Sequence, residues 1–467
     1  MEWFRSVNES VNNIIWGVPM LILLLGTGVF LSLRTGFIQI FEFRYAMKHT
    51  LGKLFKKQPQ VSGAITPFQA LTTALAATAG TGNIVGITSA ITLGGPGAVF
   101  WLWVSAIIGM CTKYAETALA VKFRVRGENG ELTGGPMYYI KYGLSKRWHW
   151  LAAPFCIFGA LAALGVGNAI QVGNMTSTIN HALAAFSPQA AGFAGVINLS
   201  VGIIVALITA LTLFGGIRRL GRATEMIVPI MSLIYVGAAL IVIFANIGRI
   251  GAVFSGIFTA ALSPAAVFGG AAGISIRSAI TWGLKRGVFS NEAGLGSAPI
   301  AHAATSEKDP VIQGLYGVFE VFIDTIVMGT ITALTLLISG IELGYGYIGT
   351  AALNINAFAT VFGLRAGALI IASCMTLFAI ATVLGWSLYG VRCCEYLLGK
   401  RSVKPYLLLY VLMTVVGATM DLSLAWEISD TLNGLMAIPN LIALLGLSGV
   451  VVQMTKGHFN DLRDLKN

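Results

Sequence analysis

Eleven long apolar stretches, separated by short polar loops, constrain the fold of this chain more than any other feature of its sequence. A helix needs roughly 20 apolar residues to cross the hydrocarbon core of a bilayer, and these stretches reach or approach that length. We therefore predict an all-α polytopic membrane protein with eleven transmembrane helices, and a short surface helix over 250–262. The predicted spans are 14–33, 67–93, 97–121, 149–179, 195–217, 224–247, 264–290, 312–339, 363–391, 405–421 and 431–454.

The composition supports a membrane location. Of the 467 residues, 56% are hydrophobic and only 10% are charged, and the mean hydropathy is +0.80. A soluble protein carries about 25% charged residues. The net charge of +11 does not indicate nucleic-acid binding, because the basic residues fall in short loops between the apolar spans. The five cysteines lie in or beside spans without metal-ligand spacing, so we interpret them as small core residues.

The basic residues predict the orientation. With residues 34–66 placed in the cytoplasm, 25 of the 30 Lys and Arg fall in cytoplasmic loops, Lys285 and Arg286 among them. Arg5 and Arg249 fall outside, and Lys113, Arg277 and Arg365 lie within spans. Positive residues gather on the cytoplasmic side of membrane proteins. This bias predicts a multi-pass protein of a bacterial-type inner membrane, with its N-terminus outside and its C-terminus in the cytoplasm.

Two of the spans are interrupted by glycine at corresponding places. Setting the first span aside leaves two sets of five, and an odd number per set means that the second set is inverted. The first span of each set carries the interruption, at 78–83 and at 269–273. Paired interrupted spans are typical of a transport site, although small residues also simply let helices pack closely. The predicted units are 1–66 (first helix and basic linker), 67–248 and 249–455 (inverted repeats), and 456–467 (cytoplasmic tail).

The interruption at 78–83 has the chemistry of a binding site. Gly costs roughly 1 kcal/mol against Ala inside a helix, and unpaired backbone groups at membrane depth need protein or water around them. The N–H groups that open the second half-helix suit a carboxylate. The carbonyls and the hydroxyls of Thr78 and Thr81 suit a small cation. In the second interruption we expect Gly270 and Gly273 to contact the substrate.

Two pairs of side chains in other spans are further candidates. Asn168 and Gln171 are one helical turn apart, so they either bind the substrate or bond to a neighbouring helix. Thr382 and Trp386 are also one turn apart. Thr382 offers an oxygen to a cation, and Trp386 either walls a small apolar pocket or anchors the helix at the interface.

Charged residues within spans are functional candidates by default. Lys113 is expected to pair with Glu116. Glu320 and Asp324 share one face, and either binds a cation or proton or forms a structural pair with Arg277 or a backbone group. Arg277 is also a weak candidate for a substrate carboxylate. Asn291 and Glu292 are interpreted as a cap or gate near the cytoplasmic end.

Several motifs resemble one known family. The stretch GGPGAVFWLW at 94–103, together with GTGNIVGI, GNAIQ, RGVFSNEAGLGSAP and LGWSLYG, resembles the sodium:alanine (alanine/glycine:cation) symporters over nearly the whole chain. The family usually has Met where this chain has Leu102. The resemblance implies a leucine-transporter-like 5+5 inverted repeat with an extra N-terminal helix, and uptake of alanine or glycine with sodium. Some relatives resemble glutamine or serine carriers.

The function predicted from the sequence is therefore sodium-coupled symport of a small neutral amino acid, alanine or glycine. No phosphate-binding loop for ATP and no nucleophile–base pair of an enzyme can be named, and no cofactor is expected besides sodium as co-substrate. The alternatives are proton coupling through Asp324 or Glu320, a glutamine or serine carrier, and a channel. The predicted sodium ligands are Thr78, Thr81 and Thr382. The predicted substrate-binding residues are Thr78, Ala79, Gly80, Thr81, Gly82, Asn83, Asn168, Gln171, Gly270, Gly273 and Trp386.

Overall fold

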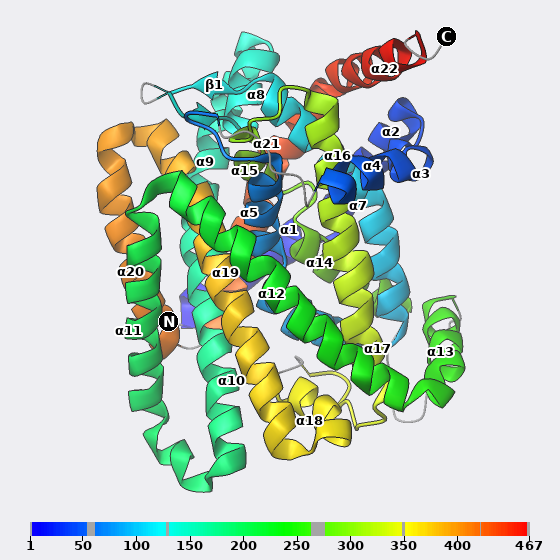
Figure 1. Cartoon of the computed structure of the whole chain (residues 1–467), viewed down its shortest axis with the longest axis vertical. Helices are drawn as coiled ribbons and strands as arrows, with labels where there is room; N and C mark the ends of the chain where they lie inside the picture. The colour runs from blue at the N-terminus through cyan, green and yellow to red at the C-terminus, as the bar shows by residue number, and fades with distance from the viewer. Residues whose placement is uncertain are drawn as a thin grey trace.

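The computed structural model describes residues 2–53, 61–127, 130–262, 276–347, 351–420 and 422–464. Helices make up nearly all the regular structure of these residues (Figure 1). One short antiparallel sheet, β1 (Val125–Arg126) with β2 (Leu132–Thr133), closes a loop between helices. The predicted all-α polytopic fold is confirmed.

Nine helical runs in the described part of the chain are long and apolar enough to cross a membrane, and one bent pair passes as a tenth span. The bent pair is α5 (Pro67–Thr78) and α6 (Val85–Gly94). The predicted span 264–290 begins outside the described residues, and its remainder is α14 (Ile276–Asn291). The nine runs are formed by α2 (Val18–Thr35), α7 (Gly97–Lys122), α9 (Ala152–Leu164) with α10 (Ile170–Phe186), α11 (Ala194–Leu213), α12 (Gly216–Ala245), α16 (Pro310–Val321) with α17 (Thr330–Ile338), α19 (Leu364–Leu398), α20 (Val403–Thr419) and α21 (Leu422–Gly446).

Shorter helices cover the two ends of the bundle. In Figure 1, α13 (Ile250–Leu262) and α18 (Ala351–Phe362) lie at the lower end, and α22 (Ser448–Asp464) lies at the upper end. The predicted short helix over 250–262 is confirmed, whereas α18 was not predicted. The other short helices are α1 (Glu2–Ile15), α3 (Ile38–Phe41), α4 (Phe43–Thr50), α8 (Pro136–Gly143) and α15 (Ala298–Ala303), with 3-10 turns at Leu51–Lys53, Lys146–Leu151, Pro188–Phe193, Ile247–Arg249 and Lys400–Ser402.

Two predicted span boundaries are wrong for local reasons. The span expected at 14–33 begins at Val18, because Gly17 is the N-cap and a proline occupies the first turn, where its missing N–H costs nothing. The residues before it form the separate amphipathic helix α1. The span expected at 431–454 ends at Gly446, and α22 starts at Ser448. Apolar residues continue across that break, so hydropathy alone does not predict it.

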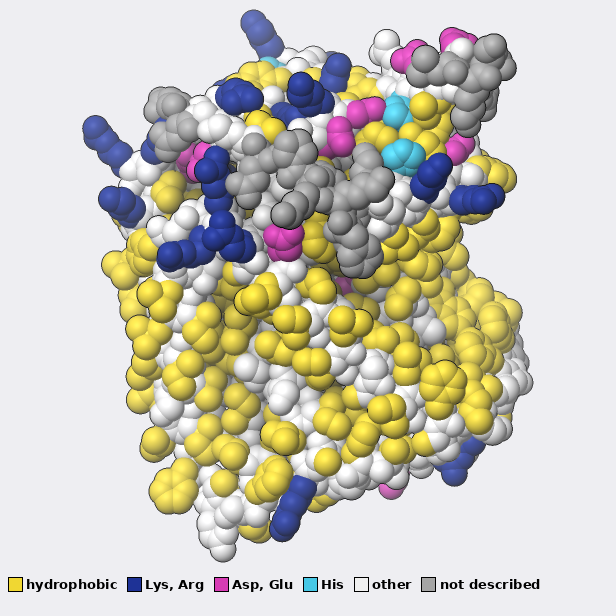
Figure 2. Space-filling view, viewed as in Figure 1, with side chains coloured by type: hydrophobic (Ala, Val, Ile, Leu, Met, Phe, Trp, Pro, Cys, Tyr) yellow, Lys and Arg dark blue, Asp and Glu magenta, His cyan; other side chains and the backbone are white. Residues whose placement is uncertain are grey.

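The surface divides into an apolar belt and a basic end. Figure 2 shows Lys and Arg side chains gathered over the upper end of this face and few at the lower end, with a broad hydrophobic band between them. The belt matches the surface that lipid chains cover. The uneven charge agrees with the bias on which the predicted orientation rests.

The two interrupted spans, α5 with α6 and α14 with α15, pack against each other and run antiparallel. Helix α5 packs against α15, while α6 packs against α14, and α14 also packs along α7. The first half of one broken span therefore lies beside the second half of the other. This antiparallel crossing brings the two interruptions together in the centre of the bundle.

Candidate substrate and ion site

The first interruption lies between α5 and α6. Helix α5 begins with a complete capping box formed by Thr66 and Gln69, and it ends at Thr78. Gly80 is extended, with φ −111° and ψ −160°, and one 3-10 turn over Thr81–Asn83 leads into α6. The two halves are bent by 57°, and residues 78–83 are all buried. The predicted interruption at 78–83 is confirmed, and it faces protein.

Close approach explains the glycine at position 80. A Cβ atom added to Gly80 would lie 2.5 Å from Oγ1 of Thr382 and 3.2 Å from Oε1 of Gln171. The Thr382 hydroxyl donates to the carbonyls of Ala76, at 2.9 Å, and Phe378, at 3.0 Å. The interruption therefore lies directly against α19 and α10. The structure brings Thr382 to the interruption, whereas the Thr78 hydroxyl donates back to Ala74 within its own helix.

An amide pair on α10 holds the 3-10 turn. Gln171 Oε1 accepts from the Thr81 N–H at 3.1 Å and from the Thr81 hydroxyl at 2.9 Å, and Asn174 donates to that hydroxyl at 2.9 Å. Asn168 points elsewhere and donates to the Tyr410 carbonyl at 2.7 Å. A π-helical turn over Gly165–Ala169 changes the register there, so Asn168 and Gln171 have different partners.

Asp324 joins the two broken spans. It lies in a π-helical segment, Phe322–Gly329, between α16 and α17, and it is fully buried. Its Oδ1 accepts from Asn83 at 2.8 Å, and its Oδ2 accepts from Ser290 and Thr325, both at 2.8 Å. Asn83 Oδ1 is buried and has no donor among the described residues. A carboxylate, an amide oxygen and two hydroxyls therefore meet where the broken spans cross.

The second interruption lies between α14 and α15. Helix α14 ends at Asn291, and Glu292, Gly294 and Gly296 then adopt positive φ angles of 54°, 91° and 82°. Residues 291–297 are all buried. Asn291 Oδ1 accepts from the N–H of Ala293 at 3.0 Å, as a helix cap would, and the gate role expected for Asn291 and Glu292 stays a prediction. The predicted interruption at 269–273, with Gly270 and Gly273, falls outside the described residues. The two glycines of NEAGLG were the sequence signal for the interruption seen here.

Glu116 on α7 supports the second interruption. Its Oε1 accepts from the N–H groups of Gly294 and Gly296, each at 3.1 Å, and from the side-chain amide of Asn440. Because the helix is interrupted here, these buried N–H groups have no helical carbonyl as acceptor, and the Glu116 carboxylate takes its place. The expected ion pair of Lys113 with Glu116 is wrong in this respect: Lys113 Nζ lies 3.4 Å from Glu320 instead.

The remaining candidate charges have other partners. Glu320 pairs with Lys113 and also lies 2.9 Å from His302 Nε2, with all three side chains fully buried. Arg277 is exposed near the start of α14, so it has no place in the buried site. Lys285 and Arg286, which the charge count placed in a cytoplasmic loop, are buried within α14.

Trp386 lies beside the site with its indole buried. Its side chain covers the π-helical turn at Gly167, where an added Cβ would clash with the Trp386 side chain. Its ring centroid lies 5.4 Å from that of Tyr389. Its Nε1 has no acceptor in the described part of the chain. The indole therefore closes one side of the region next to Thr382.

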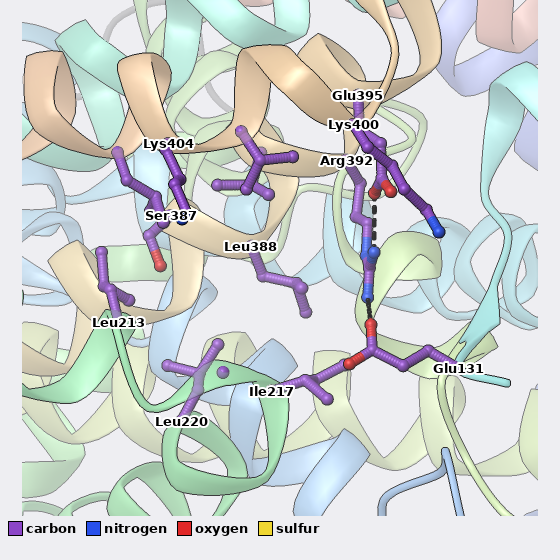
Figure 3. Close-up of a pocket in the computed structure, with 14 residues that line it drawn as sticks. Glu131, Leu213, Ile217, Leu220, Ser387, Leu388, Arg392, Glu395, Lys400 and Lys404 are labelled. Carbon is purple, nitrogen blue, oxygen red and sulfur yellow. Dashed lines mark hydrogen bonds and ion pairs between the residues drawn. The ribbon is translucent and has the colours of Figure 1, made fainter. Parts of the chain in front are cut away.

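A cavity of about 300 Å³ lies apart from the interruptions, between α11, α12, α19 and α20. Figure 3 shows Arg392 placed between Glu131 and Glu395, with Leu213, Leu220 and Leu388 on the apolar side. Arg392 donates to both carboxylates at 2.7 Å. This cavity contains none of the residues that surround the interruptions.

Broken spans that cross at a buried polar centre define a secondary transporter of the leucine-transporter-like fold. Two solved structures share the fold: MhsT in complex with L-phenylalanine (TM-score 0.57, 10% identity, 85% of this chain and 99% of that chain) and the Eremococcus coleocola manganese transporter (TM-score 0.53, 16% identity, 85% of this chain and 81% of that chain). The particular family is also shown. The model of the sodium:alanine symporter family matches residues 1–467, and the chain belongs to that family of sodium-coupled amino-acid symporters.

Relatives in this family carry different names. The chain is 47% identical over 463 residues to the "Sodium/alanine symporter AgcS" of Methanococcus maripaludis, covering 98% of each chain. It is 34% identical over 450 residues to the "Probable sodium/glutamine symporter GlnT" of Bacillus subtilis, covering 96% of this chain and 89% of that one. The predicted family is thus confirmed, and the family contains members named for alanine and for glutamine.

Proposed function

We propose that this protein imports alanine or glycine together with sodium across a bacterial-type inner membrane, with its N-terminus outside. The observation that carries the proposal is the meeting of the two interruptions at Asp324, through Asn83 and Ser290. Half-helix ends and hard oxygens at one buried point suit a zwitterion and a small cation. The name of the 47% identical relative supports alanine.

The substrate position follows from the first interruption. The carboxylate is placed against the N–H groups that open α6, within residues 78–83, because the positive end of the helix dipole favours an anion there. Gln171 fixes the turn that presents these groups. Trp386 limits the room for the side chain. Asn168, whose amide N–H bonds to Tyr410 but whose Oδ1 is buried without a donor among the described residues, completes the proposed substrate contacts together with Gly270 and Gly273.

Sodium is placed on two oxygen-rich positions. The first uses the threonines predicted from the sequence, in particular Thr382, whose hydroxyl reaches the carbonyl of Ala76 beside the interruption. The second is Asp324 with Asn83 and Thr325, where the carboxylate supplies a negative charge. An ion there orders both interruptions and so raises amino-acid affinity, and by linkage the amino acid raises ion affinity equally.

The architecture is proposed as two inverted repeats over 67–248 and 249–455, preceded by 1–66 and followed by the tail 456–467. The crossing of α5 with α15 and of α6 with α14 supports this division. Transport then follows from movement of one set of helices against the other around the crossing.

A glutamine carrier is the second candidate, because a 34% identical relative is named for glutamine. Proton coupling through Glu320 is less favoured, because Lys113 and His302 already surround that carboxylate. A panel of amino acids should be offered to proteoliposomes with sodium and proton gradients imposed separately. We expect concentrative uptake of alanine or glycine with sodium alone; strictly downhill flux would indicate a channel.

A further inference from the structure

Two adjacent cations in α14 have very different partners. Lys285 Nζ lies 2.9 Å from Asp430 Oδ2 on α21. Arg286 is only 6% exposed, yet its Nε and Nη1 find no acceptor among the residues that the structure describes. Asp430 Oδ1 is likewise buried without a donor within the described ranges. Buried donors and a buried acceptor therefore stand unused in one small cluster of net charge +1.

Aromatic rings enclose the Arg286 guanidinium. Its Cζ lies 5.6 Å from the Trp282 ring centroid, 5.5 Å from that of Phe289 and 5.1 Å from that of Trp426. Cation–π contacts hold a guanidinium in such a place, but they leave its N–H groups without acceptors. Unpaired buried donors are costly, which makes these N–H groups candidates for binding an anionic group.

The cluster lies next to the substrate position. A Cβ added to Gly82 would lie 3.5 Å from the Phe289 ring, so Phe289 separates the first interruption from Arg286. Phe289 and Trp426 meet with ring centroids 5.3 Å apart. Arg286 lies four residues before Ser290 on α14, one turn further from the interruption and toward the start of that helix. An amino acid that arrives from that end reaches Arg286 first.

We propose that Arg286 and Asp430 form a second, transient binding position for the transported amino acid. The substrate carboxylate accepts from an N–H group of Arg286 that has no other acceptor, and its ammonium group donates to Oδ1 of Asp430. The zwitterion then enters the interruption when Phe289 and Trp426 separate. The inference rests on the proposed function, because it takes the same small neutral amino acid as ligand and places the start of α14 toward the outside.

The test compares Arg286→Gln and Arg286→Lys with Arg277→Gln, a matched control on the same helix whose side chain is exposed. Initial rates of sodium-driven alanine uptake are measured in proteoliposomes over a range of external alanine. We expect Arg286→Gln to raise KM at least tenfold with a smaller change in maximal rate, and Arg286→Lys to raise KM less. The control keeps the wild-type KM.

A second variant separates binding from gate closure. Asp430→Asn removes the ammonium partner, so we expect it also to raise KM. If Arg286→Gln and Asp430→Asn leave KM unchanged and alter only the maximal rate or leak sodium, the cluster is a structural latch and the proposal is wrong. Should Arg286→Gln fail to fold, Arg286→Lys with an unchanged KM overturns it equally.

The wild type separates this inference from the proposed function. If the wild-type protein transports another neutral amino acid instead of alanine or glycine, the proposed substrate is wrong, and the same variants are measured with that amino acid. An unchanged KM for Arg286→Gln there overturns the binding position alone. If the wild type transports no amino acid, both proposals fail.

Discussion

Asn83 donates a 2.8 Å hydrogen bond to Asp324, and through this contact the first interrupted span is tied to a π-helical segment on a different helix. Asp324 also accepts from Ser290 at the end of α14. One carboxylate therefore forms hydrogen bonds to both interrupted spans. A cation bound there would stabilise the arrangement in which the two are held together.

Replacing Asp324 with Asn should weaken the coupling to sodium. The variant loses the negative charge. One of the two carboxylate oxygens, which accept from Asn83 and Ser290, becomes an NH₂ group that can only donate. We expect the sodium concentration for half-maximal alanine uptake to rise at least tenfold. Glu342→Gln, which removes an exposed carboxylate, is the control. An unchanged sodium dependence in Asp324→Asn would remove Asp324 from the ion site.

Replacing Gly80 with Ala should nearly abolish amino-acid binding. The added methyl would lie 2.5 Å from Thr382 Oγ1 and would push α19 away from the interruption, and Leu at this position would fill the interruption entirely. Gly86→Ala is the matched control, since a Cβ there meets nothing within 4 Å. Binding is measured by scintillation proximity with labelled alanine. Normal binding by Gly80→Leu would refute the placement of the site.

Replacing Trp386 with Ala should broaden the side chains that are accepted. Loss of the indole opens space beside Gly167 and Thr382, so larger neutral amino acids should compete with alanine for uptake. Trp150→Ala removes an indole that is 63% exposed and should change nothing. A Trp386→Ala protein that carries alanine and still excludes larger side chains contradicts the role of Trp386 as a pocket wall.

Replacing Glu116 with Ala should destabilise the second interruption. It leaves the N–H groups of Gly294 and Gly296 buried without acceptors, at a cost of about 1–3 kcal/mol for each. We expect a lower Tm in thermal unfolding followed by tryptophan fluorescence. Glu116→Gln keeps one acceptor oxygen and should lose less. Equal Tm values for Glu116→Ala and the wild type would mean that the carboxylate does not hold this segment.

The first interruption is predictable from the sequence because its signal is local. Glycine, threonine and asparagine at 78–83 disagree with the apolar helix around them, and no tertiary contact is needed to see that. The second interruption was missed because NEAGLG follows two basic residues, which made it look like the end of a span. Its turns depend on Glu116, a residue far away in the chain.

Side-chain contacts between helices are harder to predict from the sequence than the positions of the helices themselves. Asn168 and Gln171 were expected on one face, but a π-helical turn separates their directions, and helical spacing alone contains no sign of it. Lys285 and Arg286 were counted as loop residues because positive charge near a span end usually lies in the cytoplasm. Their burial follows from Asp430 and three aromatic rings, two of them on the same helix.

The most direct test of the account is an experimental structure determined in the presence of alanine and sodium. We predict amino-acid density beside residues 80–83, enclosed by Gln171 and Trp386, with an ion within reach of Thr382 or Asp324. Alanine bound in the cavity around Arg392, or residues 78–83 forming a continuous helix that faces lipid, would contradict the central claim that the two interruptions form the transport site.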